Sequence, residues 1–316
     1  MQEVLQFLFF KELRNIKIPK DITFIEEIRI RVGRPVMLLG KGREFFLQED
    51  GSLGNNLSKS FKPKKEDLFK ILQLISKNSI YAYQDELING FITIDGGHRV
   101  GVVGKVIVID GKVKSMVNFS GLNFRIAKNV RGCSDKILKF MVLEGQVLNT
   151  LIISPPGAGK TTMLRDVIRN LSNGISSLKL KGFKVGVVDE RFELVGGLGG
   201  RLDDFDIGIR TDVLEGSPKN IGILMLLRTM SPQVVVTDEI GDEGDFLAIK
   251  KSINSGVKII TSFHGIGLED FKLRAGLRSF LDEGLFDRVI LLGETHGKGS
   301  LEEVYDVKNK KFLYKR

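Results

Sequence analysis

The sequence of 316 residues predicts a two-domain α/β protein, with a smaller α+β domain followed by a larger domain in which helices flank a largely parallel sheet. Three observations predict this fold. A glycine-rich turn joins a strand to a helix within residues 148–171, a β-branched run at 233–239 ends in two carboxylates, and strands alternate with helices from residue 148 onward. Such alternation is typical of a parallel sheet covered by helices. We place the boundary near residue 132, so that the predicted domains span 1–132 and 133–316.

The N-terminal domain is predicted to mix strands and helices. Residues 27–39 alternate apolar and polar side chains, as a half-buried strand does, with a break at 33–35. Residues 62–75 combine an early proline, acids in the first turn and one apolar face, which indicates a helix. From 90 to 117 the pattern returns to short strands, with a hairpin turn at 110–111.

The C-terminal domain is predicted from its periodicity. A helix over 134–145 is expected to begin it, and a terminal hairpin over 301–314 to close it. The predicted strands are 148–153, 185–189, 234–238, 258–262 and 288–292, and the predicted helices are 161–171, 221–230, 242–255 and 268–281.

The turn after the first of these strands has the pattern of a phosphate-binding loop. Gly157 and Gly159 let backbone N–H groups turn toward phosphate oxygens at a helix N-terminus, where the helix dipole favours anions. Lys160 is expected to reach the β- and γ-phosphates and Thr161 to offer its hydroxyl to Mg²⁺. Ser154 replaces the first glycine of the strict pattern, at a position that only opens the turn. We therefore predict binding of ATP and Mg²⁺ by the residues of this loop: Ser154, Pro155, Pro156, Gly157, Ala158, Gly159, Lys160, Thr161 and Thr162.

Acidic and imidazole side chains follow other predicted strands. Ligands of parallel sheets bind at the carboxyl ends of the strands, so we expect Asp238 to help hold Mg²⁺ and Glu239 to orient or deprotonate the attacking water. Glu190 and His264 each follow a strand and are candidate catalytic residues, with His264 placed to sense the γ-phosphate. The alternative for these two is a solvated acid and a structural histidine.

Composition and charge limit the function classes. Hydrophobic residues make up 42% and charged residues 28%, no apolar run approaches the ~18 residues of a membrane span, and Cys133 is the only cysteine. We therefore expect a cytoplasmic protein without a transmembrane segment, intrachain disulfide or cysteine-based zinc site. Residues 1–140 hold 24 lysines and arginines against 15 acids, whereas 141–316 hold 24 of each. The basic excess could face nucleic acid, an anionic membrane, an acidic partner or a neighbour's nucleotide.

The same motifs resemble those of a known group of enzymes. Residues 227–240 resemble the Walker B region of the ATPases that drive type II and type IV secretion machines, and 189–193 and 261–265 are similar to their acidic and histidine boxes.

A narrower resemblance, to the stage III sporulation protein AA family of endospore-forming bacteria, extends over essentially the whole chain. It rests on residues 27–35, 96–101, 153–157 and 211–214.

The resemblance implies a RecA-like P-loop ATPase that hydrolyses ATP to ADP and phosphate. It implies a homo-oligomer, in a hexameric ring, that lies at the cytoplasmic face of the mother-cell membrane and acts on membrane-embedded channel proteins through N-domain movement. The family inserts arginines into a neighbour's nucleotide site, and Arg99 and Arg125 occupy the matching positions; the alternative is that both are surface arginines. The secretion ATPases usually have glycine where Asp238 stands, so Glu239 is the firmer of the two acidic assignments.

Two other functions stay open. A nucleic-acid translocase of the same fold would use the basic N-terminal domain, although the absence of interleaved aromatic residues makes nucleic acid an unlikely partner. A nucleotide-switched scaffold would bind ATP with negligible turnover. Fold alone does not separate these functions.

Overall fold

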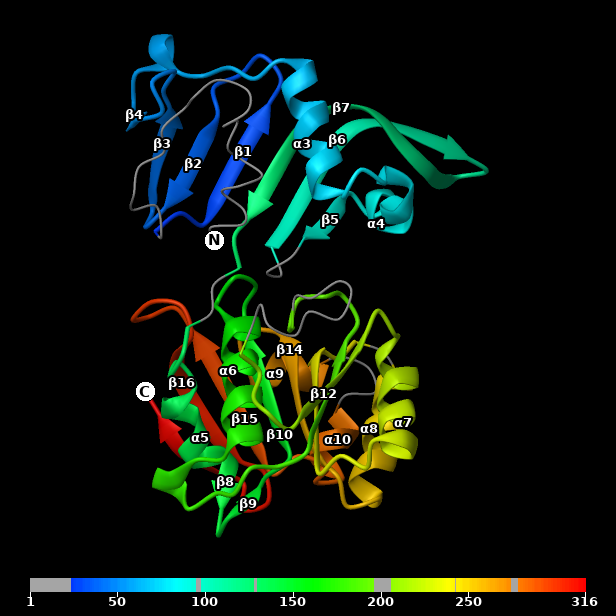
Figure 1. The fold of residues 1–316 in the computed structure, drawn as a ribbon. Coiled ribbons are helices and arrows are strands. Elements are labelled where there is room, and N and C mark those ends of the chain that lie inside the picture. The colour runs from blue at the N-terminus through cyan, green and yellow to red at the C-terminus, as the bar shows by residue number, and fades with distance from the viewer. Residues whose placement is uncertain (1–23, 95–97, 128–129, 196–205, 242, 274–277) are drawn as a thin grey trace. The chain divides into compact units, whose positions relative to one another are not determined.

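The structure, a computed structural model, describes residues 24–94, 98–127, 130–195, 206–241, 243–273 and 278–316 (Figure 1). The chain divides after Ala127 into two compact units. Residues 96–97, part of the segment 96–101 on which the family resemblance rests, lie outside the described residues.

The described residues of the first unit form an antiparallel sheet with two α-helices. The helices are α3 (Lys65–Ile75) and α4 (Gln84–Ile88), with 3-10 turns η1 (Leu57–Lys59) and η2 (Ile80–Tyr83). The strands are β1 (Glu27–Arg31), β2 (Met37–Gly40), β3 (Arg43–Leu47), β4 (Leu53–Gly54), β5 (Phe91–Ile94), β6 (His98–Ile109) and β7 (Lys112–Arg125). They are ordered β4-β3-β2-β1-β7-β6-β5.

The α3 helix closes one face of this sheet, as its apolar spacing predicts. The side chain of Asp67 accepts a hydrogen bond from the backbone N–H of Lys64 at 2.8 Å, which satisfies a free donor at the helix start. The buried leucines and isoleucines of α3 pack in one core with Ile28, Ile30 and Phe124 of the sheet.

The β6 and β7 strands are longer than the sequence pattern predicts. The pattern indicates separate short strands, whereas the structure has continuous strands with irregular register between Val103 and Lys105. The reason is Gly104, because a Cβ atom there would lie 2.7 Å from the carbonyl oxygen of Val117. The missing side chain lets the two strands stay paired through the irregularity.

The second unit is an α/β layer structure. Its main strands are β10 (Thr150–Ser154), β11 (Val185–Asp189), β12 (Thr211–Glu215), β13 (Val234–Glu239), β14 (Lys258–His264), β15 (Arg288–Gly293), β16 (Ser300–Asp306) and β17 (Lys311–Lys315), with a small hairpin of β8 (Val142–Leu143) and β9 (Gln146–Val147). Its helices are α5 (Asp135–Met141), α6 (Lys160–Asn173), α7 (Lys219–Thr229), α8 (Glu243–Asn254), α9 (Leu268–Leu273) and α10 (Arg278–Asp282), with the 3-10 turn η3 (Ser176–Leu178).

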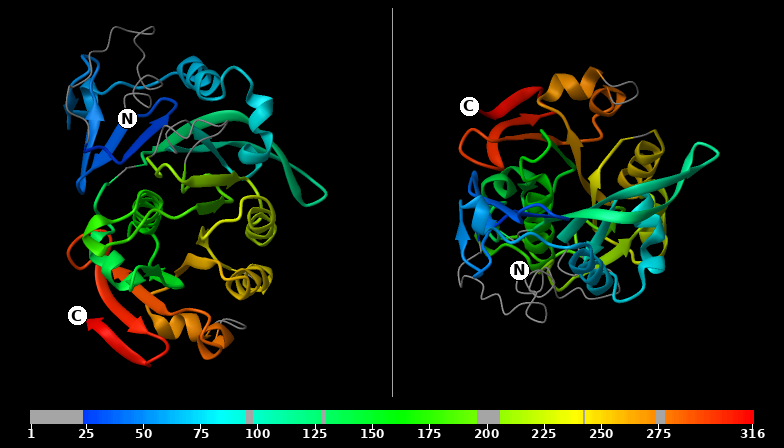
Figure 2. Two further views of the ribbon diagram at one scale, coloured as in Figure 1. Left: turned by 60° about the horizontal axis from the view of Figure 1, so that its bottom comes forward. Right: turned by 90° about the horizontal axis from the view of Figure 1, so that it is seen from above.

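The main sheet is parallel apart from its terminal hairpin. The order of the described strands is β12-β11-β13-β14-β10-β15-β16-β17, and only the β15–β16 and β16–β17 pairs are antiparallel. Leu151 and Ile153 of β10 pack in one core with residues of α7 and α8, and the buried apolar side chains of α6 lie outside that core. Helices therefore cover both faces of the sheet (Figure 2), as the alternating pattern predicts.

Two details of this unit differ from the sequence-based expectation. The β12 strand was not predicted, because its residues are all half-buried and lack a continuous apolar run. The helix predicted over 134–145 ends at Met141, where the β8–β9 hairpin begins. The helix predicted over 268–281 is described only as its segments α9 and α10, because residues 274–277 lie outside the described residues.

Candidate nucleotide-binding site

The phosphate-binding loop lies between β10 and α6, in the strand–turn–helix context that it requires. Ser154 ends β10, and α6 begins at Lys160. Gly157 and Gly159 have φ angles of 80° and 83°, in the left-handed region that side chains with a Cβ rarely adopt. A Cβ at Gly157 would meet no atom within 4 Å, so the backbone there borders open space. The two glycines thus form an open turn at a helix N-terminus, where an anion is favoured.

Lys160 is the first residue of α6 and is buried, with 8% of its surface exposed. Its Nζ atom has no hydrogen-bond partner among the residues that the structure describes. Burial lowers the pKa of Lys160, and the carboxylates of Glu239 and Asp238 oppose that shift. A buried ammonium without a partner is costly unless a ligand pairs with it. The site therefore fits an anionic group such as a phosphate.

The ends of three parallel strands meet beside this loop. Ser154 of β10 pairs in register with His264 of β14, and Glu239 ends β13 on the other side of β14. The Nε2 atom of His264 lies 3.1 Å from Oε2 of Glu239, and its Nδ1 atom is buried without a hydrogen-bond partner among the described residues. The structure thus places these two predicted catalytic residues in contact.

Asp238 points into a buried cluster of charges that the sequence does not reveal. Its Oδ1 atom lies 3.3 Å from Nζ of Lys219, which also forms an ion pair with Glu190. Burial raises the pKa of Asp238 to about 7, although the ammonium of Lys219 opposes that shift. Burial alone would lower the pKa of Lys219, but the two carboxylates outweigh it and raise the pKa. Lys219 therefore joins two of the predicted site residues.

Lys219 is a site residue that sequence reasoning missed. It begins α7 and is 6% exposed, whereas a lysine in the first turn of a surface helix is usually solvated. The preceding Pro218 predicts only a helix start.

The loop between β15 and β16 is a second feature that was missed. A Cβ atom at Gly159 would lie 3.6 Å from Cβ of Lys298 and 3.7 Å from the backbone nitrogen of Gly299. This glycine-rich loop therefore borders the phosphate-binding loop.

Arg99 and Arg125 lie in the first unit. They are cross-strand neighbours on β6 and β7, and the guanidinium carbon of Arg99 lies 3.6 Å from the centre of the Phe91 ring. The side chain of Arg125 is exposed. Their predicted role at a neighbour's nucleotide is a property of an assembly, and it stays a prediction.

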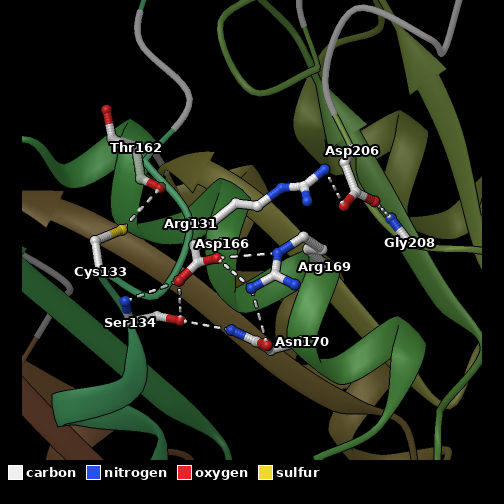
Figure 3. A network of polar contacts seen from close by, with 9 residues as sticks. All are labelled: Arg131, Cys133, Ser134, Thr162, Asp166, Arg169, Asn170, Asp206 and Gly208. Carbon is white, nitrogen blue, oxygen red and sulfur yellow. Dashed lines mark hydrogen bonds and ion pairs between the residues drawn. The ribbon is translucent and has the colours of Figure 1, made fainter.

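A polar network fastens the start of the second unit to the phosphate-binding helix (Figure 3). Asp166 of α6 accepts hydrogen bonds from the backbone N–H of Ser134 at 2.9 Å and from its hydroxyl at 2.7 Å. Arg169 donates to the other carboxylate oxygen at 2.7 and 3.1 Å, and the amide of Asn170 donates to the Ser134 hydroxyl at 3.0 Å. Cys133 donates to the carbonyl oxygen of Thr162 at 3.6 Å. Residues 133–134 are therefore tied to α6 at three successive turns, through Thr162, Asp166 and Asn170.

Burial disfavours the thiolate form of the neighbouring cysteine. Cys133 is half-buried, and burial raises its pKa to about 11. It is a packed residue, because the thiolate that reacts or binds metals is scarce at such a pKa.

The donor set also fits the predicted magnesium ion. Thr161, at the start of α6, is half-buried, and the buried Asp238 offers a carboxylate whose Oδ1 lies 3.3 Å from Nζ of Lys219. Hydroxyl and carboxylate oxygens are ligands that Mg²⁺ prefers, with water completing the shell. Across the described ranges, no group of three or more His, Cys, Asp or Glu side chains forms a protein-only metal cage.

Within the ranges that the structure describes, no helix is long and apolar enough to cross a membrane.

Comparisons with known proteins agree with this geometry. The family model "Sporulation stage III, protein AA" matches residues 1–312. The chain is 39% identical over 282 residues to Stage III sporulation protein AA of Bacillus subtilis (strain 168), covering 89% of this chain and 87% of that protein.

Solved structures extend the agreement to the fold. The ATPase DotB of Legionella pneumophila superposes with a TM-score of 0.58 at 16% identity, covering 97% of this chain and 81% of that one. The pilus retraction motor PilT with bound ADP gives a TM-score of 0.57 at 14% identity, covering 92% and 80%. The predicted RecA-like P-loop fold is thereby confirmed.

Proposed function

The chain belongs to the sporulation stage III protein AA family, and from this premise we propose that it is a P-loop ATPase that drives a membrane-embedded channel during endospore formation. The observation that carries the proposal is the buried ammonium of Lys160, which lacks a partner at the mouth of a loop shaped by two left-handed glycines. ATP supplies the phosphate that such a site requires.

Each residue of the loop then has a role in binding. Lys160 pairs with the terminal phosphates, while the backbone N–H groups of the loop from Ser154 to Thr162 surround the remaining oxygens. Thr161 and Asp238 would hold Mg²⁺, which when bound neutralises charge on the β- and γ-phosphates. Lys219 keeps the Asp238 carboxylate in place through its ion pair.

Glu239 is the residue that we assign to water activation. Its carboxylate ends β13 beside the loop, where it can orient the attacking water and accept its proton. The contact with His264 at 3.1 Å holds that carboxylate in one orientation, and His264 would sense the γ-phosphate. Glu190 acts through its ion pair with Lys219, so its role is to position rather than to react.

The polar network around Asp166 supports a route from nucleotide to movement. Because α6 begins at Lys160, a shift of this helix on hydrolysis would be passed to Ser134, close to where the chain leaves for the first unit. We propose that this route moves the first unit within a homo-oligomeric ring, a hexamer, at the cytoplasmic face of the mother-cell membrane. Head-to-tail contacts in such a ring allow Arg99 or Arg125 to complete a neighbour's site.

Two variants test the proposal. Lys160→Ala is expected to weaken ATP binding at least about 100-fold, because the charge that pairs with phosphate is lost. Glu239→Gln is expected to keep ATP affinity while turnover falls by about 10²–10⁴, the usual contribution of a general base. Nucleotide titration and steady-state phosphate release measure the two effects.

Matched substitutions control for changes of charge alone. Lys136→Ala and Glu243→Gln alter exposed side chains and are expected to leave both measurements unchanged. Wild-type turnover by Glu239→Gln refutes the assignment of the base. Tight ATP binding by the wild type with no turnover under any condition favours the nucleotide-switched scaffold.

The basic excess of residues 1–140 also favours a second candidate function, that of a nucleic-acid translocase. Under the proposed function, DNA binds weakly with steep salt dependence and does not change turnover. Strong stimulation of hydrolysis by single-stranded DNA at physiological salt would favour the translocase.

A further inference from the structure

The hairpin of β6 and β7 changes character along its length. Near its base, Val100, Val102, Leu122 and Phe124 are at most 3% exposed and belong to the core of the first unit. Beyond the irregularity at Gly104, the paired strands add no fully buried residue to this core, and only the half-buried Met116, near the β7 end of the segment, packs against it among the described residues. We call residues 105–117 the β6–β7 arm, which extends from the sheet in Figure 1.

The tip of the arm exposes apolar side chains in succession. Val106, Ile107, Val108 and Ile109 are 42%, 38%, 58% and 51% exposed. Because successive side chains of a strand point to opposite faces, both faces of the ribbon are apolar at this end. A strand end of this kind promotes aggregation unless it has a partner.

The charges around the tip are almost all positive. Lys105, Lys112 and Lys114 are exposed, and Asp110 in the turn is the only acid between residues 105 and 117. Lysines can extend their ammonium groups toward an aqueous anionic layer while their alkyl stems follow the apolar surface. The arm therefore has an apolar tip that is flanked by exposed lysines.

These features together match an anionic lipid surface. A flat protein surface would cover one face of a ribbon and leave the other in water, whereas a bilayer boundary surrounds an inserted tip on both faces. Anionic headgroups complement the three lysines. A nucleic acid would pair with the lysines but offers no apolar medium for the valine and isoleucine side chains.

We propose that the β6–β7 arm binds the protein to anionic membranes, with residues 106–109 entering the headgroup boundary and the lysines contacting lipid phosphates. The proposal deepens the proposed function by naming the surface on which the ATPase sits, and it rests on that function only for its biological setting. Membrane binding by the arm requires no nucleotide.

A tryptophan reporter tests insertion directly, because the chain has no tryptophan of its own. The full chain carrying Ile109→Trp is mixed with phosphatidylcholine vesicles, with or without phosphatidylglycerol, in the absence of nucleotide. A blue shift of the emission is expected with the anionic vesicles only. The control, Leu57→Trp, reports from an equally exposed site on η1 (54% against 51%) and is expected to show no shift.

Vesicle co-sedimentation separates the two parts of the arm. Replacing both Lys112 and Lys114 by Gln is expected to weaken binding about fivefold per lysine and to reduce its salt dependence. Val108→Ser with Ile109→Ser is expected to weaken binding at least about tenfold. Lys59→Gln with Lys70→Gln is the matched control for charge.

The outcomes are distinguishable. Equal binding by the wild type and both arm variants, or no binding of the wild type to anionic vesicles, overturns the proposal. If the arm variants instead change the oligomeric state in sedimentation while vesicle binding is absent, the arm contacts a second copy and the proposal is wrong. Glu239→Gln, which is expected to lose turnover, is expected to bind vesicles as tightly as the wild type. Failure of the ATPase assignment would therefore leave vesicle binding unchanged, whereas failure of the membrane proposal would abolish it.

Discussion

Removing the Asp166 carboxylate is expected to destabilise the second unit more than any other single change in the network of Figure 3. Asp166 is 3% exposed and accepts hydrogen bonds from Ser134 and Arg169. The substitution Asp166→Ala leaves the N–H and hydroxyl of Ser134, which is 0% exposed, without their acceptor. It also leaves the Arg169 guanidinium unpaired.

The magnitude follows from burial. A buried donor left unsatisfied costs ~1–3 kcal/mol, and removing one partner of a buried ion pair costs ~3–5 kcal/mol. The Arg169 side chain is 19% exposed, so water replaces part of the lost pairing and the low end applies. We expect a loss of about 3–4 kcal/mol in the free energy of unfolding. At ~2–4 °C per kcal/mol for a unit of this size, Tm falls by about 6–16 °C.

Thermal and urea unfolding measure this loss, with Asn170→Ala as the matched control on the same helix. Asn170 donates a single bond to Ser134, so its removal is expected to cost about 1 kcal/mol. A loss for Asp166→Ala no larger than that of the control refutes the reasoning.

The pH dependence of the same variant gives a second test. Burial raises the pKa of Asp166, but the hydrogen bonds from Ser134 and Arg169 outweigh it, and the pKa is lowered. A lowered pKa in the folded state means that the stabilisation is complete above the unfolded value of ~3.9 and is lost as the pH falls through the folded value. The difference between the wild type and Asp166→Ala is therefore expected to shrink below about pH 4.

Two further predictions concern the site. Lys219→Met leaves the buried Asp238 without its cation and is expected to lower the free energy of unfolding by about 3 kcal/mol in urea titrations; a loss below about 1 kcal/mol would show that these ion pairs contribute little. Arg99→Ala or Arg125→Ala is expected to abolish hydrolysis while ATP affinity is kept. Mixing either variant with Lys160→Ala is expected to restore part of the activity, because a Lys160→Ala subunit still donates its arginine to a neighbour's site. No rescue in mixtures shown to co-assemble contradicts the trans mechanism.

Most of the second unit could be predicted because its pattern is local. The run ending at Glu239 and the strand at 185–189 are buried on both faces, so their apolar character is visible without tertiary information. The β12 strand could not be found in this way, because it is half-buried throughout and depends on pairing with β11.

The candidate site also contains residues that local sequence predicts and residues that only tertiary packing brings in. Gly157, Gly159 and Lys160 are neighbours in sequence, and their spacing alone indicates a backbone turn with a charge at its end. Lys219 and Lys298 have no such signal, because their place in the site comes from the packing of α7 and of the β15–β16 loop.

The sequence by itself determined most of the backbone segments that form strands and helices, and it determined the phosphate-binding turn, since these depend on side-chain periodicity and on glycine at positions of positive φ. Only the tertiary structure decided which distant charges meet and how far each is removed from water. Desolvation and partner distance control the state of Asp238, Lys219 and the unpaired ammonium of Lys160, and both arise only when the strand ends converge.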